Sequence, residues 1–470
     1  MDKSTKKILG TIVILLATLI LLIPFWYVLI LSLKEFSPMR GLFGSPWVGF
    51  KNFSAFINSP YFTKILSNTF VISILGTIIG AVYVFISSLA IGGGKNSVKK
   101  GILALIFALP AIIPINLFAG ILPREILMTP SFILRLAVSV IDGLRVAGLL
   151  VICAFFIKDD VLKNSLKCML LFVAIRFIFI MTPDAMVINR IYNPLTYEIL
   201  DVFSTYTYRT GLINANYSMA ASVHIIKTLL QFIPCVIACL ILVLITKNKA
   251  EKTVVLENSN FQPAVIGAVV PAIILIATII TGGSLLPAGV NKMVIMGYVN
   301  EILIALVSGI LVTVISLGLA IAARNSGAIG LIAIALLCLT GNCMSGKYLL
   351  IHTIGLTNTF LGVVLNNLSM ISVLALILTF ATYNNRGLIN NVSAFTFGFG
   401  MMFSWFWGDS ISPMTILRDR AVYPLSLVLR EITISAGEIT SGFLTTLPYI
   451  IIPIAVAVAG IAVGVLIKKD

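Results

Sequence analysis

The sequence predicts an all-α polytopic membrane protein, and three observations lead to that fold class. Of its 470 residues, 59% are hydrophobic and only 10% are charged, whereas soluble domains carry roughly 25% charged residues. Apolar segments of about 20 residues, the length of a bilayer-spanning helix, recur from Ile8 to Ile467. Ten-residue segments of alternating polarity, which are typical of an outer-membrane barrel, do not occur in the sequence.

The hydropathy pattern predicts about 12 spans, six in each half of the chain. The first six lie near residues 8–33, 66–91, 101–122, 131–157, 168–182 and 218–246. The second six lie near residues 263–281, 298–323, 328–345, 358–381, 392–408 and 443–467. Each is expected to be a helix, because a helix pairs all of its backbone polar groups within the lipid.

The net charge of +15 is explained by orientation in the membrane. With the N-terminus inside, the predicted cytoplasmic segments hold 16 basic and 6 acidic residues, which agrees with the positive-inside rule. These basic residues are divided among short loops and form no single stripe, so no nucleic acid partner is expected. We expect a multi-pass protein surrounded by membrane lipid, with both termini in the cytoplasm.

A polar segment, KNKAEKTVVLENSNFQ, separates the two sets of spans. It predicts six-helix modules at residues 1–247 and 263–470, joined by a cytoplasmic linker at 248–262. Two pseudo-equivalent modules about an axis normal to the membrane are a frequent way to build a central transport pathway. The first outer segment is long in the first module and is reduced to GGSLLPAGVNK in the second.

Four sequence blocks resemble a known family. VGFKNFSAFINSPYFTKILSNTFVISILG, from Val48, and YNPLTYEILDVFSTYTYRTGLINANYSMAASV, from Tyr192, are similar to the LplB-type permeases of binding-protein-dependent sugar ABC importers. GKYLLIHTIGLTNTFLGVVL, from Gly346, and MFSWFWGDSISPMTILRDRAVYPLSLVLREI, from Met402, resemble their YtcP-type partner subunit. The resemblance implies a bacterial cytoplasmic membrane, an oligosaccharide or polysaccharide substrate class, and a substrate-binding lipoprotein at the outer face.

The family's ATPase-docking loop departs from this pattern. Such permeases carry E-A-A-x3-G-x9-I-x-L-P in a cytoplasmic loop, whereas this chain has FFIKDDVLKNSLKCM and ATYNNRGLINNVSA at the two corresponding positions. The residues of these degenerate coupling loops are Lys158, Asp159, Asp160, Lys163, Asn384, Asn385 and Arg386. We therefore expect conventional docking of a cytoplasmic ATPase to be lost, and the chain has no phosphate-binding G-x-x-x-x-G-K-[ST] motif of its own.

Charges inside predicted spans are candidates for the transport path or for ion pairs between helices. Asp142 and Arg145 are three residues apart and could pair along one helical turn. Lys227 and Arg176 have no acid within four residues on their own helices, so each needs a partner from another helix. For Asp142 and Arg145 the alternative to a pathway role is a purely structural ion pair.

The predicted outer segments mix aromatic rings with charged groups, a combination that recognises sugar faces and hydroxyls. The candidates are Tyr197, Glu198, Asp201, Tyr206, Tyr208 and Arg209 in the first half, and Trp405, Trp407, Asp409, Tyr423, Arg430 and Glu431 in the second. The alternative for Trp405 and Trp407 is an interfacial anchor. For Tyr206, Tyr208 and Arg209 the alternative is a rim that seats an external protein, and the family resemblance implies such a rim.

Metal and redox chemistry are not expected. The six cysteines lack metal-ligand spacing, and there are only two histidines. The sequence contains no recognisable catalytic triad or carboxylate pair, so no cofactor and no enzymatic activity are expected.

The leading hypothesis is a fused, diverged ABC-importer-type permease of the carbohydrate class. Two alternatives stay open: a non-transporting membrane scaffold for cell-envelope proteins, and an ATP-independent conduit. In each case an outer-face partner is expected to contact the segments 34–65, 183–217 and 409–442.

Overall fold

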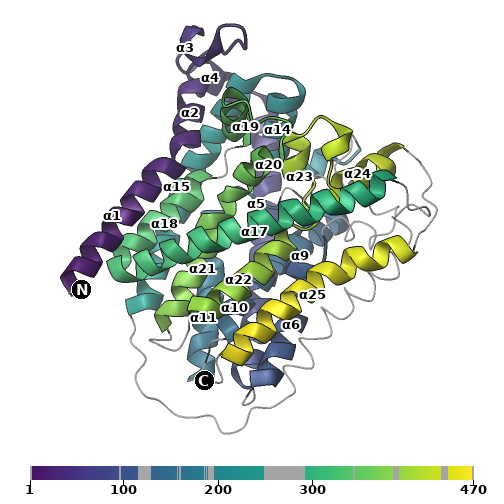
Figure 1. Ribbon diagram of the computed structural model, residues 1–470. Coiled ribbons are helices and arrows are strands. Elements are labelled where there is room, and N and C mark those ends of the chain that lie inside the picture. Colours follow the sequence, from purple (N-terminus) through teal and green to yellow (C-terminus); the bar gives the residue numbers. More distant parts are fainter. Residues whose placement is uncertain are drawn as a thin grey trace.

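The computed structural model is a bundle of helices (Figure 1). It describes residues 3–94, 97–114, 129–155, 157, 160–184, 186, 188, 195–247, 292–341, 344–384, 391–435 and 443–467. Within these ranges there is no strand, apart from one isolated antiparallel bridge between Lys34 and Trp47.

The first half of the described chain contains thirteen helical elements. They are α1 (Lys3–Leu21), α2 (Ile23–Ser32), α3 (Gly41–Gly44), α4 (Lys51–Ile57), α5 (Pro60–Gly92), α6 (Ser97–Ile112), α9 (Phe132–Leu149), α10 (Val151–Phe155), α11 (Val161–Ile178), α13 (Tyr197–Leu200), α14 (Phe203–Tyr208), η1 (Arg209–Ile213) and α15 (Tyr217–Lys247).

The second half of the described chain contains eleven helical elements. They are α17 (Lys292–Ser326), α18 (Ala328–Gly341), α19 (Met344–Thr353), α20 (Phe360–Asn367), η2 (Leu368–Met370), α21 (Ile371–Asn384), α22 (Asn391–Phe406), α23 (Ile411–Ile416), η3 (Arg420–Val422), α24 (Leu425–Ser435) and α25 (Phe443–Ile467).

Five helical segments of the described chain are long and apolar enough to cross a membrane. They are Lys7–Ser32, Pro60–Gly92, Tyr217–Thr246, Lys292–Ser326 and Phe360–Ala381. Two shorter apolar helical stretches, Ala328–Thr340 and Pro448–Val463, accompany them. The chain is therefore an all-α protein with the helices of a multi-pass membrane protein, and the predicted count of about 12 spans is not confirmed.

Several predicted spans differ from the helices observed. The span predicted at 131–157 is divided at Leu150 into α9 and α10. The helix α6 of the span at 101–122 ends at Ile112, and the span predicted at 263–281 lies outside the described residues. The division at Leu150 is tolerated because α10 is buried among other helices, which can satisfy freed backbone groups.

Glycines allow α5, α9 and α11 to pack closely. Gly76 and Gly80 stand one turn apart on α5, and a Cβ on Gly143 of α9 would overlap the Gly76 backbone carbonyl. A Cβ on Gly80 would overlap the Phe172 ring of α11. Small residues at such crossings let helix backbones approach in lipid, where van der Waals packing supplies much of the association energy.

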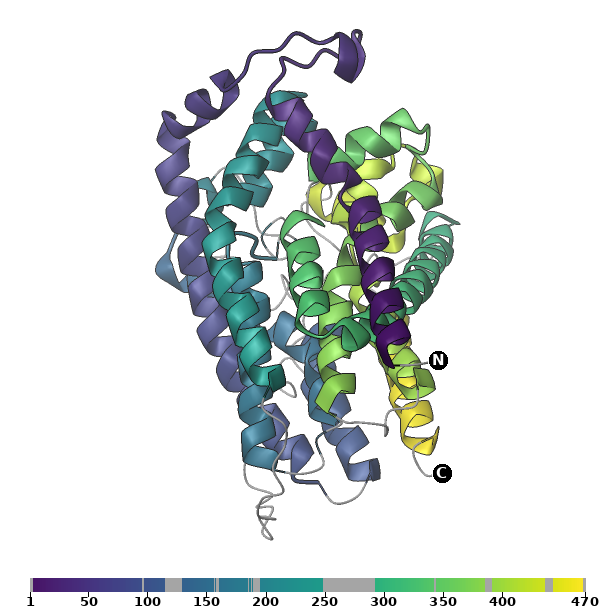
Figure 2. The same ribbon diagram turned by 90° about the vertical axis from the view of Figure 1, so that its left-hand side faces the viewer.

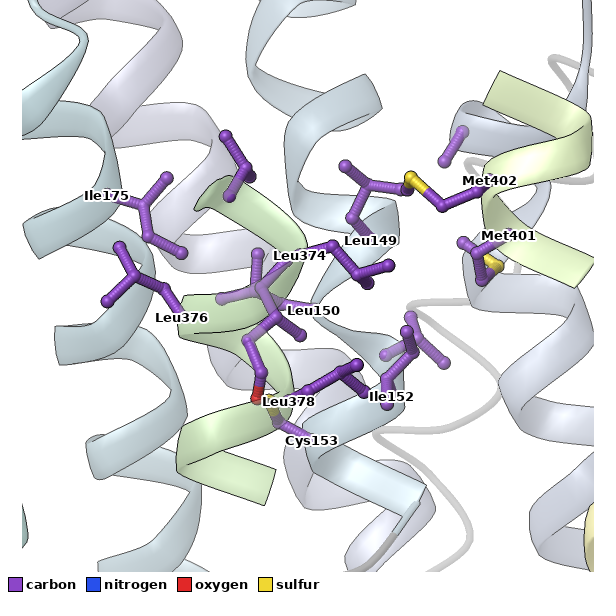
Figure 3. Packing of buried hydrophobic residues seen from close by; sticks show 14 of the residues in the cluster. Leu149, Leu150, Ile152, Cys153, Ile175, Leu374, Leu376, Leu378, Met401 and Met402 are labelled. Atoms are coloured by element: carbon purple, nitrogen blue, oxygen red, sulfur yellow. Dashed lines mark hydrogen bonds between the residues drawn. The ribbon is translucent and has the colours of Figure 1, made fainter. Parts of the chain in front are cut away.

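The two halves interlock. The helix α1 packs against α17 and α18, and Figure 2 shows its purple ribbon lying against the green helices of the second half. Thr11 Oγ1 lies 3.3 Å from Ser326 Oγ, and Gly10 fits against the Ala322 carbonyl. In the other direction, α6 packs against α22 and α25. Hydrophobic residues from both halves share one core, in which Leu149, Leu150 and Ile175 meet Leu374, Leu376 and Met401 (Figure 3).

Two asparagines make matching contacts in the two halves. Asn68 on α5 donates from Nδ2 to the carbonyls of Glu198 and Asp201. Asn300 on α17 donates from Nδ2 to the carbonyls of Ala421 and Tyr423. Each long helix thus holds the segment that precedes a shorter helix, α14 in the first case and α24 in the second.

Candidate functional site

A cavity of about 200 Å³ lies where the two halves meet. Its first-half lining includes Asp142, Val146, Leu149, Ile175, Arg176, Phe179, Thr182, Pro183, Asp184 and Met186. Its second-half lining includes Cys338, Lys347, Asn366, Asn367, Ser369, Met370, Val373, Trp405, Phe406, Asp409, Ile411 and Ser412. We call this space the central cavity.

Asp142 on α9 forms a buried ion pair with Arg176 on α11. The Arg176 Nη2 to Asp142 Oδ2 distance is 2.5 Å, and both side chains are at most 3% exposed. Arg176 also donates to the Ser73 carbonyl and to Thr77 Oγ1 on α5. The inter-helix partner that the sequence required for Arg176 is therefore Asp142, and the pair joins three helices.

The pairing of Asp142 with Arg145 along one turn of α9 is wrong. Arg145 instead pairs with Asp184, at 2.5 Å from Nη1 to Oδ2. Sequence spacing places Asp142 and Arg145 on one face of α9. In the structure Asp142 and Arg176 meet next to Gly76 of α5, whereas Arg145 reaches Asp184. Two stronger partners at the helix crossings thus replace the weak local pair.

Four charges therefore form one network beside the central cavity, and Asp142, Arg176 and Asp184 of that network line the cavity. The Asp184 N–H donates to Asp142 Oδ1 at 2.8 Å, which connects the two ion pairs. Arg145 ends the network by lying over the Trp405 ring, 4.0 Å from its centroid, so the network reaches from the first half into the second. Opposite charges in equal number limit the cost of burying each one.

Trp405 and Trp407 are both buried inside the helix bundle. Trp407 is completely buried and donates from Nε1 to the Tyr449 carbonyl at 2.9 Å. Trp405 is 6% exposed and lines the central cavity beneath Arg145. An interfacial anchor would be expected to face the lipid headgroups, whereas both rings are buried, and of the two only Trp405 lines the central cavity.

Asp409 lies in the turn between α22 and α23 and also lines the central cavity. Its Oδ1 accepts hydrogen bonds from the N–H groups of Ile411 and Ser412, at 2.9 and 3.3 Å. Burial raises the pKa of the Asp409 carboxyl above its usual range, although these hydrogen bonds oppose the shift. A second buried acid, Glu301 on α17, accepts from the N–H groups of Gly408 and Ser426 and so fixes the same turn.

Lys227 on α15 is buried, but it does not line the central cavity. It lies close enough to His224 to interact with it electrostatically, and Lys347 of α19 does the same from the second half. Lys347 is also buried and does line the cavity. His224 thus interacts with one buried lysine from each half of the chain.

The predicted outer residues of the first half form a separate cluster. Arg209 pairs with Asp201 at 2.8 Å and lies over the rings of Tyr197 and Tyr206. Glu198 is exposed, and its backbone carbonyl accepts from Asn68. None of these residues lines the central cavity, so the structure separates them from Asp142 and Trp405.

Tyr208 connects this cluster to the second half. Burial raises the pKa of Tyr208, while the charges of Arg430 and Arg418 act to lower it, which places both arginines near the ring. Glu431 pairs with the exposed Arg420 at 3.3 Å. Tyr423 is half-buried next to them. This surface therefore contains residues from both predicted outer segments.

The coupling-loop residues are only partly described. The helix α10 ends at Phe155 and α11 begins at Val161, with Asp160 in a left-handed conformation (φ 45°) just before it and Lys163 in its first turn. Asn384 ends α21, and α22 begins at Asn391. Lys158, Asp159, Asn385 and Arg386 lie outside the described residues.

The part of the chain that the structure describes contains no metal site. Cys153, Cys168, Cys235, Cys239 and Cys338 are free thiols, and Cys343 lies outside the described residues. In the same ranges no group of three or more potential metal ligands occurs.

Sequence reasoning missed two charged residues of the central cavity, Asp184 and Lys347. Asp184 follows a predicted span in TPDAM and was counted with the outer loop. Lys347 stood within a block that resembles permeases, but it carried no separate signal. An acid directly after the span that contains Arg176 was the one hint, since a buried arginine requires a carboxylate nearby.

No protein-family model and no curated protein matches the sequence. Two solved structures of a bacterial alginate ABC transporter are similar in part. One, a complex with an alginate pentasaccharide-bound periplasmic protein, has 22% identity and a TM-score of 0.36 over 43% of this chain and 85% of that chain. The other, a transporter involved in the import of the acidic polysaccharide alginate, has 21% identity and a TM-score of 0.35 over the same shares.

Proposed function

We propose that this chain is a diverged carbohydrate permease of the ABC-importer type, with both permease halves fused in one polypeptide. The observation that carries the proposal is the central cavity, because each half contributes polar and aromatic lining to it. The permease-like sequence blocks at Val48, Tyr192, Gly346 and Met402 support the same function. The matching contacts of Asn68 and Asn300 support two equivalent modules.

The central cavity has the chemistry of a saccharide site. Trp405 and Phe406 offer apolar ring faces, while Asn366, Asn367 and Asp409 offer hydrogen-bonding groups. Sugars are bound through this combination of a flat apolar face and directed polar groups. At about 200 Å³ the space is smaller than the roughly 300–1,000 Å³ of small-molecule sites. Passage of an oligosaccharide therefore requires the two halves to move apart.

The proposal includes orientation and partners but no catalysis. Both termini would face the bacterial cytoplasm, and the segments 34–65, 183–217 and 409–442 would contact a substrate-binding lipoprotein or another envelope protein. The surface around Tyr208, Arg418 and Arg430 belongs to this outer contact region.

Binding in detergent tests the saccharide function. We would titrate the purified chain with maltopentaose and with alginate pentasaccharide, using isothermal titration calorimetry. Wild type is expected to bind at least one of them, Trp405→Ala to lose that binding, and the lipid-facing control Trp26→Ala, which is 54% exposed, to keep it. Absence of binding to both sugars, or unchanged binding by Trp405→Ala, would refute the proposal.

A non-transporting scaffold is the second candidate, and the coupling positions favour it. Only residues 156–160 separate α10 from α11, and only 385–390 separate α21 from α22. A stable specific interface usually buries about 1,200 Å² or more, which such short connections do not readily supply. We therefore propose that no conventional two-ATPase complex forms.

Co-purification with a sugar-importer ATPase tests whether ATPase docking is lost. The scaffold and the ATP-independent conduit both predict that no ATPase is recovered with the chain. Stoichiometric recovery that is abolished by Lys163→Glu with Arg386→Glu, but not by Lys64→Glu, would restore an ordinary ATP-driven importer.

A further inference from the structure

Four large apolar side chains stand exposed close to the point where α2 ends. They belong to residues 34–50, the stretch around α3, which we call the α3 segment. Their exposed fractions are 99% for Met39, 91% for Phe43, 64% for Trp47 and 75% for Phe50. Large apolar side chains that gather on a protein surface usually mark an interaction site.

A buried lysine fixes the fold of the α3 segment. Lys34 is 3% exposed and donates from Nζ to the carbonyls of Leu42 and Phe43, at 2.8 and 3.1 Å. Its Nζ also lies 4.7 Å from the centroid of the Trp47 ring, and a backbone bridge joins the same two residues. The four apolar side chains are therefore held on the outside of a folded unit.

The α3 segment lies at one end of the span that α1 and α2 form. The helical segment Lys7–Ser32 has 26 residues and is apolar enough to cross a membrane. At about 1.5 Å per residue it is longer than the roughly 30 Å hydrocarbon core, so its ends reach the headgroups. Leu42 belongs to the same buried cluster as Val28 and Leu31, which keeps the α3 segment beside the last turns of α2. Figure 1 shows α3 and α4 at the end of α2 that is remote from the N-terminus.

The exposed side chains change in chemistry along this path. Those of α1 and α2 are mostly aliphatic, and Leu16, Leu19, Ile23 and Trp26 are each between 49% and 63% exposed. In the α3 segment aromatic rings predominate, and the basic residue Arg40 is exposed next to Met39. Aliphatic residues at hydrocarbon depth, followed by aromatic and basic residues at headgroup depth, are typical of a chain that passes from the lipid core into the membrane interface.

We propose that the α3 segment is a membrane-interface anchor, whose four apolar side chains insert between the headgroups and the acyl chains where α2 leaves the bilayer. Arg40 then lies among the lipid phosphates. The proposal does not depend on saccharide transport. It assigns lipid to one part of the segment 34–65 and leaves residues 51–65 to the outer protein contact.

Depth measurement with a spin label tests the proposal. In a cysteine-free background, Phe43→Cys would carry a nitroxide in proteoliposomes. Its collisions with oxygen, which concentrates in lipid, would be compared with its collisions with a water-soluble nickel chelate. The aqueous control is Arg420→Cys, and the control in the lipid core is Ile78→Cys, whose side chain is 58% exposed on α5. We expect the oxygen-to-nickel ratio at residue 43 to be several-fold above that at residue 420 and below that at residue 78.

A second label position avoids replacing one of the aromatic rings. With the nitroxide at Met39→Cys, adding Phe43→Ser and Phe50→Ser is expected to lower the oxygen-to-nickel ratio, because fewer apolar side chains then hold the segment in the lipid. The matched control Ile213→Ser, at an exposed position of η1, should leave the ratio unchanged.

Three results would overturn the proposal. A ratio at residue 43 as low as that at residue 420 would place the α3 segment in water. Rare collisions with both reagents would show that protein covers the segment. An unchanged ratio at residue 39 after the two Phe→Ser substitutions would show that the apolar side chains do not hold the segment in lipid. None of these results bears on saccharide binding, so the two proposals fail separately.

Discussion

Asp142 and Arg176 are the residues on which the site's stability depends most. Replacing Asp142 by Ala leaves the buried Arg176 without its carboxylate, and the expected loss is about 3–5 kcal/mol in the free energy of unfolding. Replacing Glu431, whose partner Arg420 is largely exposed, should cost no more than about 1 kcal/mol. Chemical unfolding in detergent measures both.

A double-mutant cycle distinguishes the observed pairing from the local one. Asp142→Ala should couple strongly with Arg176→Ala and only weakly with Arg145→Ala, because coupling energies follow direct contact. Stronger coupling to Arg145 would mean that the pair along one turn of α9 is the real one.

Asp409 gives the site a pH dependence whose sign follows from its raised pKa. The folded state holds the Asp409 proton more tightly than the unfolded state does. The stabilisation by the protonated carboxyl is therefore complete below the pKa of Asp in the unfolded state, about 3.9. It is lost as the pH rises through the folded pKa. The asparagine side chain of Asp409→Asn does not titrate. The stability of wild type should therefore fall relative to that of the variant as the pH rises from the unfolded-state pKa of Asp409 to its folded-state pKa. A difference that grows in favour of wild type as the pH rises would contradict the assignment.

At the scale of elements, the crossing of α5 and α9 depends on Gly143. Gly143→Ala should destabilise the protein by about 1–3 kcal/mol, because the new Cβ overlaps the Gly76 carbonyl. Gly318→Ala, on the open face of α17, meets no atom within 4 Å and should change stability by between zero and a gain of about 1 kcal/mol. Thermal unfolding in detergent compares the two, and equal effects would show that the close crossing is absent.

Hydropathy predicted long helices better than broken ones. The predicted spans at 66–91, 218–246 and 298–323 each lie within a single helix, because a continuous apolar run is what lipid exposure requires. The break at Leu150 has no local signal, since the run around it stays apolar and neighbouring helices decide where it divides. The partner of Arg145 was equally hidden, because spacing along α9 gives the position of a side chain but not the helix that faces it.

The two halves of the molecule are interlocked, and a disulfide bond between them tests this arrangement. Thr11 and Ser326 come from opposite halves with hydroxyl oxygens 3.3 Å apart, so Thr11→Cys with Ser326→Cys should form a disulfide. With a protease site inserted at 248–262, the oxidised variant should stay one band after cleavage on a non-reducing gel. Thr11→Cys with Ile315→Cys, on the lipid-facing side of α17, is the control that should separate. Separation of both pairs would refute the interlocked arrangement.

We propose that a saccharide binds in the central cavity between the two halves, and protection of a cysteine placed in that cavity tests this proposal. In a cysteine-free background, Asn366→Cys places a thiol in the central cavity and Ile78→Cys places one on the lipid-facing surface. A small, membrane-impermeant thiol reagent should label Asn366→Cys in proteoliposomes. The sugar that binds wild type should slow this labelling several-fold, while Ile78→Cys should stay unlabelled. Labelling of Asn366→Cys at an unchanged rate when that sugar saturates the protein would contradict the account.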